Sequence, residues 1–572
     1  MYLMAKLIKD HAILLFISIG ILVFANSLFN AFVWDDKGFI IANPDIQIFN
    51  LLSYLRLNSF NNLGIYRPIF GIYFGTLYTL FKESSFYYHA LQLAIHITNT
   101  ILVFYLLKKF FQEKLSFFLS LFFLVHPIQV ESVVWISSTV NPLFFLFGLT
   151  ALHVSFKATL ETKKILSISL LLLLALLTKE SAILFLFVIL IYQLLFAKKN
   201  LPKIFLSEVI SLCSYLFLRV VVGGVLFTKT VSLAVPITNL SFSERLLNIP
   251  SVIFYYIKTF FWPANLSIDQ LWIIKTINFQ NFYFPAIMVL SFFLFICLLG
   301  IFIYTKKRKL FPPFIFFFLW FLAGLVTISQ IVPIDMTVAD RFFYFPFVGL
   351  LGIFGVFLCC LKVTNKLVIQ VLVSVTILLL ILLSVRTIVR NSNWSNAATL
   401  YAHDLNINDN FDLEDNLGSE LGLMGKYQAA LPHFQKSVAL FPYENNLYNL
   451  GVVYEKLGNI ENAKVNYYKA INAKNFVQPN HKHFLFIYIK FIETLLLNGS
   501  YTESEAVTSQ ALANYPDNPQ LFLYLSISQY ELNNYDAALA SIKQAKSLGA
   551  SDQINYVFTQ VSNHKPLKLT AN

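Results

Sequence analysis

Long apolar runs recur along this chain, and they restrict its fold more than any other feature. The first run, residues 12–32, is long enough to cross a bilayer, because about 20 apolar residues span about 30 Å of hydrocarbon. It lacks a small-residue cleavage site and is followed by many similar runs, so we interpret it as a retained helix rather than a secretory signal. With 57% hydrophobic and 13% charged residues, the composition also argues against an ordinary soluble domain. The sequence therefore predicts an all-α, polytopic membrane protein.

The positions of the basic residues predict which end of each helix faces the cytoplasm. A net charge of +12 would suggest nucleic-acid binding in a soluble protein, but here Lys and Arg cluster in short connections between apolar runs, so we expect no nucleic-acid partner. We place these clusters and the N-terminus on the cytoplasmic side and the C-terminus outside. The clusters are Lys6 with Lys9; Lys108, Lys109 and Lys114; Lys157, Lys163 and Lys164; Lys198, Lys199 and Lys203; residues 306–309; and Lys362 with Lys366. About eleven spans are predicted, at residues 11–31, 87–107, 115–126, 141–157, 165–178, 181–197, 204–222, 283–304, 312–330, 344–361 and 367–386.

Two amphipathic stretches lie in the long loops on the opposite side. Counting residues 246–262 as a span would place the basic residues 306–309 outside, so we expect this stretch to lie on the outer face or dip into it. Residues 45–57 show the same helical spacing of apolar positions. The outer loops, residues 32–86 and 223–282, are long and the cytoplasmic connections are short. We therefore expect the functional site on the outer face.

The composition changes after Arg390, and a repeat of about 34 residues appears in the chain that follows. Leucine, glycine, alanine and aromatic positions recur in the same order, which is the tetratricopeptide pattern of paired helices. Small residues, among them Gly451, Ala430, Ala463 and Ala538, should let the paired helices approach closely. The repeats are expected outside the cytoplasm, where they either dock an extended polypeptide or act as a rigid spacer. The predicted segments are a membrane domain at 1–390, a linker at 391–415, about four repeats at 416–550 and a tail at 551–572.

Ionisable residues at the outer ends of the spans are the candidates for chemistry, since charge near lipid is costly. No nucleotide-binding loop, zinc-spaced His and Cys set or nucleophile elbow occurs. Asp35 and Asp36 are adjacent carboxylates, so at least one should have a raised pKa and could act as a general base. The alternative is that one of them is a solvated loop residue or a helix cap.

Further candidates follow the same rule, each with a structural alternative. Glu131 is a candidate second carboxylate for substrate hydroxyls or a divalent cation, Mg or Mn. His126 is a candidate for substrate binding, or else it satisfies the backbone groups at a helix end. Lys179 and Glu180 interrupt an apolar hairpin, either as its exposed tip or to meet an anion.

Arginine and histidine complete the set of candidates. Arg341 and Arg67 suit phosphate contact, or else anchor the chain at the interface. His89 and His96 share one helix face, which favours hydrogen bonds between helices over metal binding. This inventory is consistent with transfer from a lipid-carried phosphate donor to an outer acceptor, with a carboxylate as base and cations on the phosphate.

An ordered series of motifs then makes the prediction specific. "FVWDDKGFIIANPDI", "YRPI", "YHALQLAIHITNTILVFYLL", "HPIQVESVVWISS", "TKES", "FFWPANLSID" and "DRFFYFPFVG", followed by the repeats, resemble the transmembrane and tetratricopeptide-repeat O-mannosyltransferases and their bacterial relatives. The resemblance implies a GT-C glycosyltransferase fold, a polyprenyl-phosphate-linked sugar donor and inverting transfer to a protein Ser or Thr. The family's functional motifs fall on Asp35, Asp36, Glu131, Lys179, Glu180 and Arg341.

Within this frame we expect Asp35, nearer the membrane, to be the base and Asp36 to orient it or meet the acceptor. The chain shows Asp340 where animal members often show Glu, and mannose itself does not follow from the resemblance. Richness in Phe, Ile, Asn and Lys favours a bacterial inner membrane, with periplasmic repeats, over the endoplasmic reticulum. Alternatives are sugar transfer to a lipid or surface glycan, and a non-catalytic assembly factor that uses the repeats as a scaffold.

Overall fold

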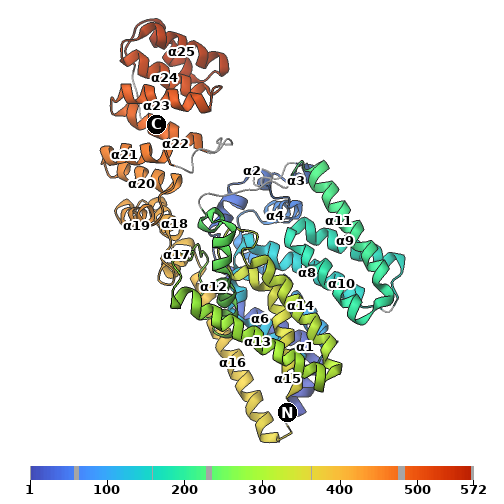
Figure 1. Ribbon diagram of the computed structural model, residues 1–572. Helices are drawn as coiled ribbons and strands as arrows, with labels where there is room; N and C mark the ends of the chain where they lie inside the picture. Colours follow the sequence, from blue (N-terminus) through green and yellow to red (C-terminus); the bar gives the residue numbers. More distant parts are fainter. Residues whose placement is uncertain are drawn as a thin grey trace. The chain divides into compact units, whose positions relative to one another are not determined.

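The computed structural model describes residues 2–56, 64–157, 159–226, 235–361, 364–473 and 484–567, with side chains from Asp10 onward. The predicted basic residues Lys6, Lys9 and Lys362 therefore lie outside the side chains described. Throughout the described residues every regular element is a helix, as predicted. The chain divides into two compact units, Met1–Asn408 and Asp409–Asn572 (Figure 1).

The first unit is a helical bundle. Eleven of its helices match the predicted spans: α1 Tyr2–Phe24, α5 Ser85–Lys108, α6 Glu113–Val125, α8 Val140–Ser155, α9 Thr162–Thr178, α10 Ile183–Phe196, α11 Leu201–Leu216, α13 Phe284–Lys306, α14 Phe311–Ile328, α15 Tyr344–Cys360 and α16 Lys366–Asn393. By length and composition, eight helices in the described part of the chain can cross a membrane, or nine if α6 and the short helix α7, Val130–Val134, form one bent span. The multi-pass prediction is confirmed, whereas the count of eleven stays a prediction because α9 and α10 are shorter.

The outer surface of the bundle is apolar where lipid would contact it. Leu294 on α13 and Leu382 on α16 are exposed, at 60% and 58%. The interior is aromatic, and small residues bring its helices together: a side chain at Gly349 of α15 would meet the backbone of Phe321 on α14 at 2.5 Å. Glycine is required there because the two backbones touch.

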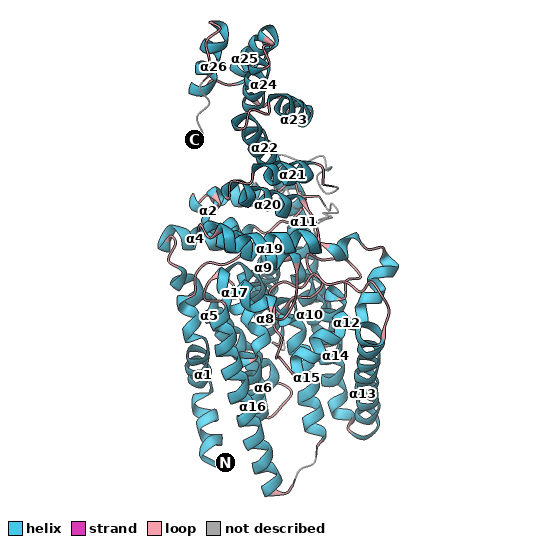
Figure 2. Ribbon diagram, turned by 90° about the vertical axis from the view of Figure 1, so that its left-hand side faces the viewer, coloured by secondary structure: helices cyan, strands magenta, loops and turns pink. Residues whose placement is uncertain are grey.

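The connections at one end of the bundle carry extra structure. α2 Pro44–Gln47 and α3 Leu51–Arg56 occupy the stretch predicted as one interfacial helix, and α4 Pro68–Phe81 follows in what was predicted as loop. α12, Phe242–Phe261, begins with a Ser241–Glu244 capping box and buries Val252, Tyr256 and Phe260. It is not among the span candidates found in the described residues, in agreement with the prediction for 246–262. In Figure 2, α2, α4 and α17 (Ala397–Leu405) lie at the opposite end of the bundle from the N-terminus and the start of α16.

The second unit is a solenoid of paired antiparallel helices. Four pairs and a last helix follow in order: α18 Phe411–Leu423 with α19 Tyr427–Leu440, α20 Glu444–Lys456 with α21 Ile460–Ile471, α22 Leu485–Leu497 with α23 Tyr501–Asn514, α24 Pro519–Glu531 with α25 Tyr535–Leu548, and α26 Asp552–Ser562. Ala430, Ala463 and Ala538 are fully buried between helices, and a side chain at Gly451 would meet Tyr467 at 2.6 Å. The predicted role of these small residues is confirmed.

The unit boundary falls inside the segment predicted as a linker, 391–415. Residues 391–393 complete α16, α17 packs with the first unit, and α18 already belongs to the solenoid. The predicted tail, 551–572, holds α26, whose Ile554, Val557 and Val561 are buried. The polar composition of both segments reflects helices with one buried side rather than free chain.

Candidate functional site

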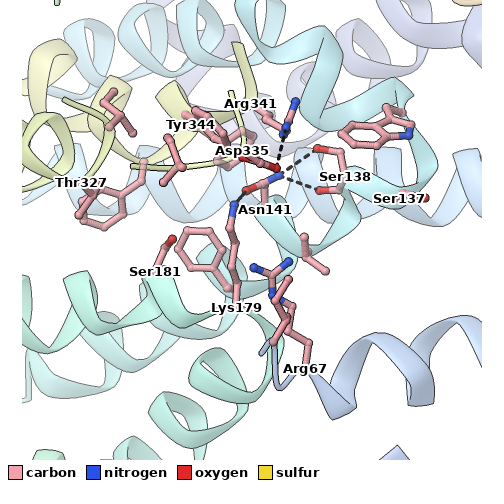
Figure 3. Close-up of a pocket in the computed structure, with 18 of the residues that line it drawn as sticks. Arg67, Ser137, Ser138, Asn141, Lys179, Ser181, Thr327, Asp335, Arg341 and Tyr344 are labelled. Atoms are coloured by element: carbon pink, nitrogen blue, oxygen red, sulfur yellow. Dashed lines mark hydrogen bonds and ion pairs between the residues drawn. The ribbon is translucent and has the colours of Figure 1, made fainter. Parts of the chain in front are cut away.

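A pocket of about 530 Å³ opens among the connections at the α2–α4 end of the bundle (Figure 3). Four of the predicted site residues, Asp35, Arg67, Lys179 and Arg341, line it. Apolar side chains form much of the remaining wall, including Phe39, Phe70, Phe144, Leu184 and Phe345. The lining residues come from six separate parts of the chain, namely residues 35–39, 65–70, 135–144, 179–184, 235–238 and 327–346.

Asp35 and Asp36 face different surroundings although they are adjacent. Asp36 is fully buried, and its Oδ1 accepts hydrogen bonds from the Ser137 backbone N–H at 2.8 Å and the Ser137 hydroxyl at 2.6 Å. Its Oδ2 accepts from the Val33 N–H at 3.1 Å. Asp35 is half-buried and lines the pocket. Asp36 therefore fixes the loop, and Asp35 is the one of the two carboxylates that lines the pocket.

The backbone immediately before Asp35 has a strained conformation. Trp34 has a φ of +52°, a conformation that costs a non-glycine residue free energy. Its ring stacks on Trp135 with centroids 4.7 Å apart, which offsets that cost. Burial raises the pKa of Asp36 to about 6, and the hydrogen bonds from Ser137 and Val33 oppose the shift. The predicted raised carboxyl pKa thus falls on Asp36.

Arg341 and Glu131 form a buried ion pair. Glu131 accepts from the Arg341 backbone N–H at 2.9 Å, and its Oε1 accepts from the guanidinium. Both side chains are at most 6% exposed. The guanidinium carbon lies 5.0 Å from the Trp135 ring centroid and 4.8 Å from that of Phe342. Glu131 is not part of the pocket wall, so its contact with a substrate would be indirect, through the position of Arg341.

Lys179 reaches into the same pocket. Its Nζ donates to Asn141 Oδ1 at 2.6 Å, and Asn141 in turn donates to Ser138. Partial burial, together with the charges of Arg67 and Arg341, lowers the pKa of Lys179 to about 7. Among the residues the structure describes, Lys179 makes no salt bridge. The residue lines a pocket, which differs from the alternative of an exposed hairpin tip.

Arg67 is held by Glu180 at the start of α4. Its Nε and Nη2 both donate to Glu180 Oε2, at 3.0 and 2.9 Å. Arg219 lies 3.6 Å from the other oxygen of Glu180 and donates to the Gly64 carbonyl at 2.7 Å. Glu180 thus ties the α9–α10 connection to two outer segments, and it contributes to the pocket through Arg67.

His126 lies away from the pocket. Its Nδ1 accepts from the Ile128 N–H at 3.2 Å, and its Nε2 is 3.1 Å from the Phe260 carbonyl, so it serves a helix end. Asp340 is likewise buried and accepts from the Tyr255 hydroxyl at 2.5 Å instead of pairing with Arg341. The contacts of His126 match the structural alternative given for that residue.

The histidine stripe on α5 holds helices together. His96 Nδ1 lies 2.9 Å from the Tyr344 hydroxyl, His96 Nε2 lies 3.1 Å from the Leu124 carbonyl, and His89 Nε2 lies 3.1 Å from the Asn30 carbonyl. Within the described ranges, no group of three or more His, Cys, Asp or Glu side chains is placed to hold a metal ion. A divalent cation therefore stays a prediction from the sequence.

Asp335 is the site residue that the sequence analysis missed. It lines the pocket, and its Oδ2 lies 3.6 Å from Arg341 Nη2. Its only signal was a single acidic residue in the short segment 329–339 between two apolar runs. Nothing in that pattern indicates which side chain it meets, because the contact depends on how the segment turns back.

Comparison with known proteins agrees with both units. Two tetratricopeptide-repeat family models match residues 445–476 and 491–553. Protein O-mannosyl-transferase F38B6.6 from Caenorhabditis elegans is 26% identical over 463 residues, which cover 75% of this chain and 63% of that protein. Protein O-mannosyl-transferase TMTC3 from Homo sapiens is 24% identical over 560 residues, covering 87% and 60%. The relatives of this chain are protein O-mannosyl-transferases.

The O-mannosyl-transferase relatives confirm the resemblance that the ordered motifs indicated. The match to TMTC1 from Mus musculus is 30% identical over 151 residues, which cover 24% of this chain and 16% of that protein. The chain spans 60–63% of the length of the first three O-mannosyl-transferases it matches. A solved structure, MamA 41-end from Desulfovibrio magneticus RS-1, covers 27% of this chain and 92% of its own at 16% identity, with a TM-score of 0.23.

Proposed function

We propose that this protein is a membrane glycosyltransferase of the GT-C type that moves a sugar from a polyprenyl-phosphate donor to a Ser or Thr hydroxyl of a protein. The observation that carries the proposal is one pocket in which Arg67, Lys179 and Arg341 lie with Asp35. Three cations suit a phosphate, and the apolar part of the remaining wall suits an isoprenoid chain. The names of the relatives support transfer to protein.

The reaction follows from the chemistry of these groups. Asp35 removes the proton of the acceptor hydroxyl, whose oxygen attacks the anomeric carbon of the sugar. The bond from that carbon to the phosphate oxygen breaks, and the polyprenyl phosphate leaves with its negative charge stabilised by Arg341, Lys179 and Arg67. Attack from the side opposite the leaving group inverts the anomeric carbon. Asp36 and Glu131 act by position, because each is buried and holds a neighbour of the pocket.

The proposed compartment is the outer one. The pocket residues come from connections that alternate along the chain with the short basic ones, such as that between Lys306 and Phe311. The positive-inside rule places the basic connections in the cytoplasm and the pocket on the periplasmic or lumenal side. We propose a bacterial inner membrane, with the repeats docking the acceptor protein. Labelling of single-Cys variants in intact cells tests the side of the membrane proposed for the pocket and the side proposed for the basic connections.

Transfer by the purified protein in proteoliposomes tests the proposed activity. With a polyprenyl-phosphate sugar and a Ser/Thr-rich acceptor, Asp35→Asn should lower kcat about 100-fold or more, the usual effect of removing a general base. Asp45→Asn is the matched control, since Asp45 is exposed on the same outer segment and outside the pocket wall. Full activity of Asp35→Asn would refute the assignment.

The acceptor is tested separately. Mass spectrometry of envelope proteins, lipids and glycans, with and without the gene, should show loss of glycosylated Ser and Thr peptides. A truncated chain ending at Asn408 should keep donor binding and lose transfer to protein, because the solenoid begins at Asp409. If the truncated chain still glycosylates protein, the docking role assigned to the repeats is wrong.

A further inference from the structure

The two terminal nitrogens of the Arg341 guanidinium differ in their contacts: Nη1 is held firmly and Nη2 is held weakly. Nη1 and the backbone N–H are both bound by the buried carboxylate of Glu131. Nη2 has two weak contacts, Asp335 Oδ2 at 3.6 Å and Met336 Sδ at 3.5 Å. Figure 3 shows Asp335 beside the guanidinium at the pocket. Thus Nη2 is the part of Arg341 that can change partners without disturbing the buried ion pair.

The segment that carries Asp335 is fixed on both sides of it, and before it the Ile334 N–H donates to Gln330 Oε1 at 3.2 Å. Gln330, at a φ of +65°, donates through Nε2 to the carbonyls of Met336 and Thr337, at 2.6 and 2.9 Å. The hydroxyl of Thr337 donates to the Trp272 carbonyl at 2.6 Å. The backbone is therefore held, while the Asp335 side chain is 72% exposed. Such a side chain can rotate away from Arg341 without movement of the segment.

Asp335 also acts on Lys179. Its negative charge opposes the lowering of the Lys179 pKa, so the carboxylate is near two of the three pocket cations. The contact joins an exposed carboxylate to the guanidinium at 3.6 Å, which is longer than a hydrogen bond, so a bound phosphate can displace this carboxylate at low cost. Until it is displaced, the carboxylate repels small anions from the same cations.

We propose that Asp335 is a specificity-determining residue that occupies the anion position on Arg341 in the donor-free protein and gives way to the phosphate of a lipid-linked donor. An isoprenoid phosphate can displace it because the apolar wall of the pocket supplies additional binding free energy. Inorganic phosphate lacks that contribution and is excluded. This inference rests on the proposed function, since it takes the pocket to bind an isoprenoid phosphate.

Equilibrium binding to the full-length protein in detergent micelles tests the inference without any transfer step. The probes are farnesyl phosphate, its uncharged counterpart farnesol, and inorganic phosphate as a competitor. Asp335→Asn should bind farnesyl phosphate about three- to fivefold more tightly and become sensitive to inorganic phosphate, with farnesol unchanged. Asp335→Glu should restore the discrimination. Glu83→Gln, an exposed acid outside the pocket wall, should change nothing.

The outcomes separate the two proposals. If wild-type protein binds farnesyl phosphate and Asp335→Asn binds it equally or more weakly, the role of Asp335 is refuted and the proposed function stands. If farnesyl phosphate binds no better than farnesol to either protein, the phosphate site itself is refuted, and both proposals fail.

Discussion

Lys179 gives the sharpest test of the pocket as a phosphate site, because its charge should change near neutral pH. Its pKa is lowered to about 7 by partial burial and by Arg67 and Arg341. In the donor-free protein the side chain is about nine-tenths protonated at pH 6 and about one-tenth protonated at pH 8. The cationic form binds phosphate, so kcat/KM for the donor should fall about tenfold per pH unit above 7.

Lys179→Arg separates this effect from other titrations. Arginine stays charged throughout, so kcat/KM of this variant should become independent of pH between about 7 and 9. Bound donor phosphate favours the protonated lysine, so the wild-type kcat profile should fall at a higher pH than the kcat/KM profile. Lys258→Arg, an exposed lysine on α12 outside the pocket wall, is the control. Superimposable wild-type and Lys179→Arg profiles would refute the reasoning.

The contribution of Lys179 to the free energy of unfolding should rise with pH, whereas activity should fall. The pKa of Lys179 falls from 10.5 in the unfolded chain to about 7 in the folded one. Between those values the unfolded chain binds the proton that the folded chain has released, so the contribution of Lys179 to stability rises with pH. Thermal unfolding in detergent, with Lys179→Arg and wild type scanned from pH 7 to about 10, measures this difference.

Four further predictions follow from the surroundings of single residues. Glu131→Gln leaves a guanidinium without its carboxylate, so the protein should lose about 3 kcal/mol of stability and donor KM should rise, as measured by thermal unfolding and initial rates. Asp36 accepts hydrogen bonds on both oxygens, so Asp36→Asn places an NH2 group against the donors of either Ser137 or Val33, and it should cost about 1–3 kcal/mol and lower kcat more than it raises KM. Gly451→Ala drives a methyl group into a tyrosine ring and should destabilise the solenoid by about 1–3 kcal/mol, detected by hydrogen exchange. Gly422→Ala, in a helix with open space around it, should stabilise by up to about 1 kcal/mol.

Which predicted site residues meet in the pocket could not be read from the chain. Asp35, Arg67, Lys179 and Arg341 all stand near the ends of helices, and from that position the sequence predicts that they lie on one side of the membrane. His126 stands at such an end too, yet it bonds to the Phe260 carbonyl and faces the protein interior. Position at a helix end limits depth in the bilayer, but it does not set the rotation of the helix about its axis.

The extra structure in the outer loops escaped prediction for a related reason. α4 is 14 residues long, which is too short to span a membrane. The sequence alone did not distinguish this helix from an apolar loop, because the helix packs against α2 and α5, and these contacts are visible only in the structure. Asp335 is a lone acid whose partner, Arg341, is only six residues away, and the backbone between them is held by hydrogen bonds from the Gln330 side chain to the Met336 and Thr337 carbonyls.

The sequence by itself determined the all-helical class of fold, its multi-pass character and the repeats, whereas the orientation in the membrane stays a prediction. The three features that it determined depend on short-range properties: the length of an apolar run and the period of small residues. Tertiary structure alone decided that Asp36 is buried while Asp35 lines the pocket. It also decided that Glu131 forms an ion pair with Arg341 and that Asp335 contacts the same guanidinium. Such outcomes depend on contacts between segments as much as 210 residues apart, and no local pattern specifies them.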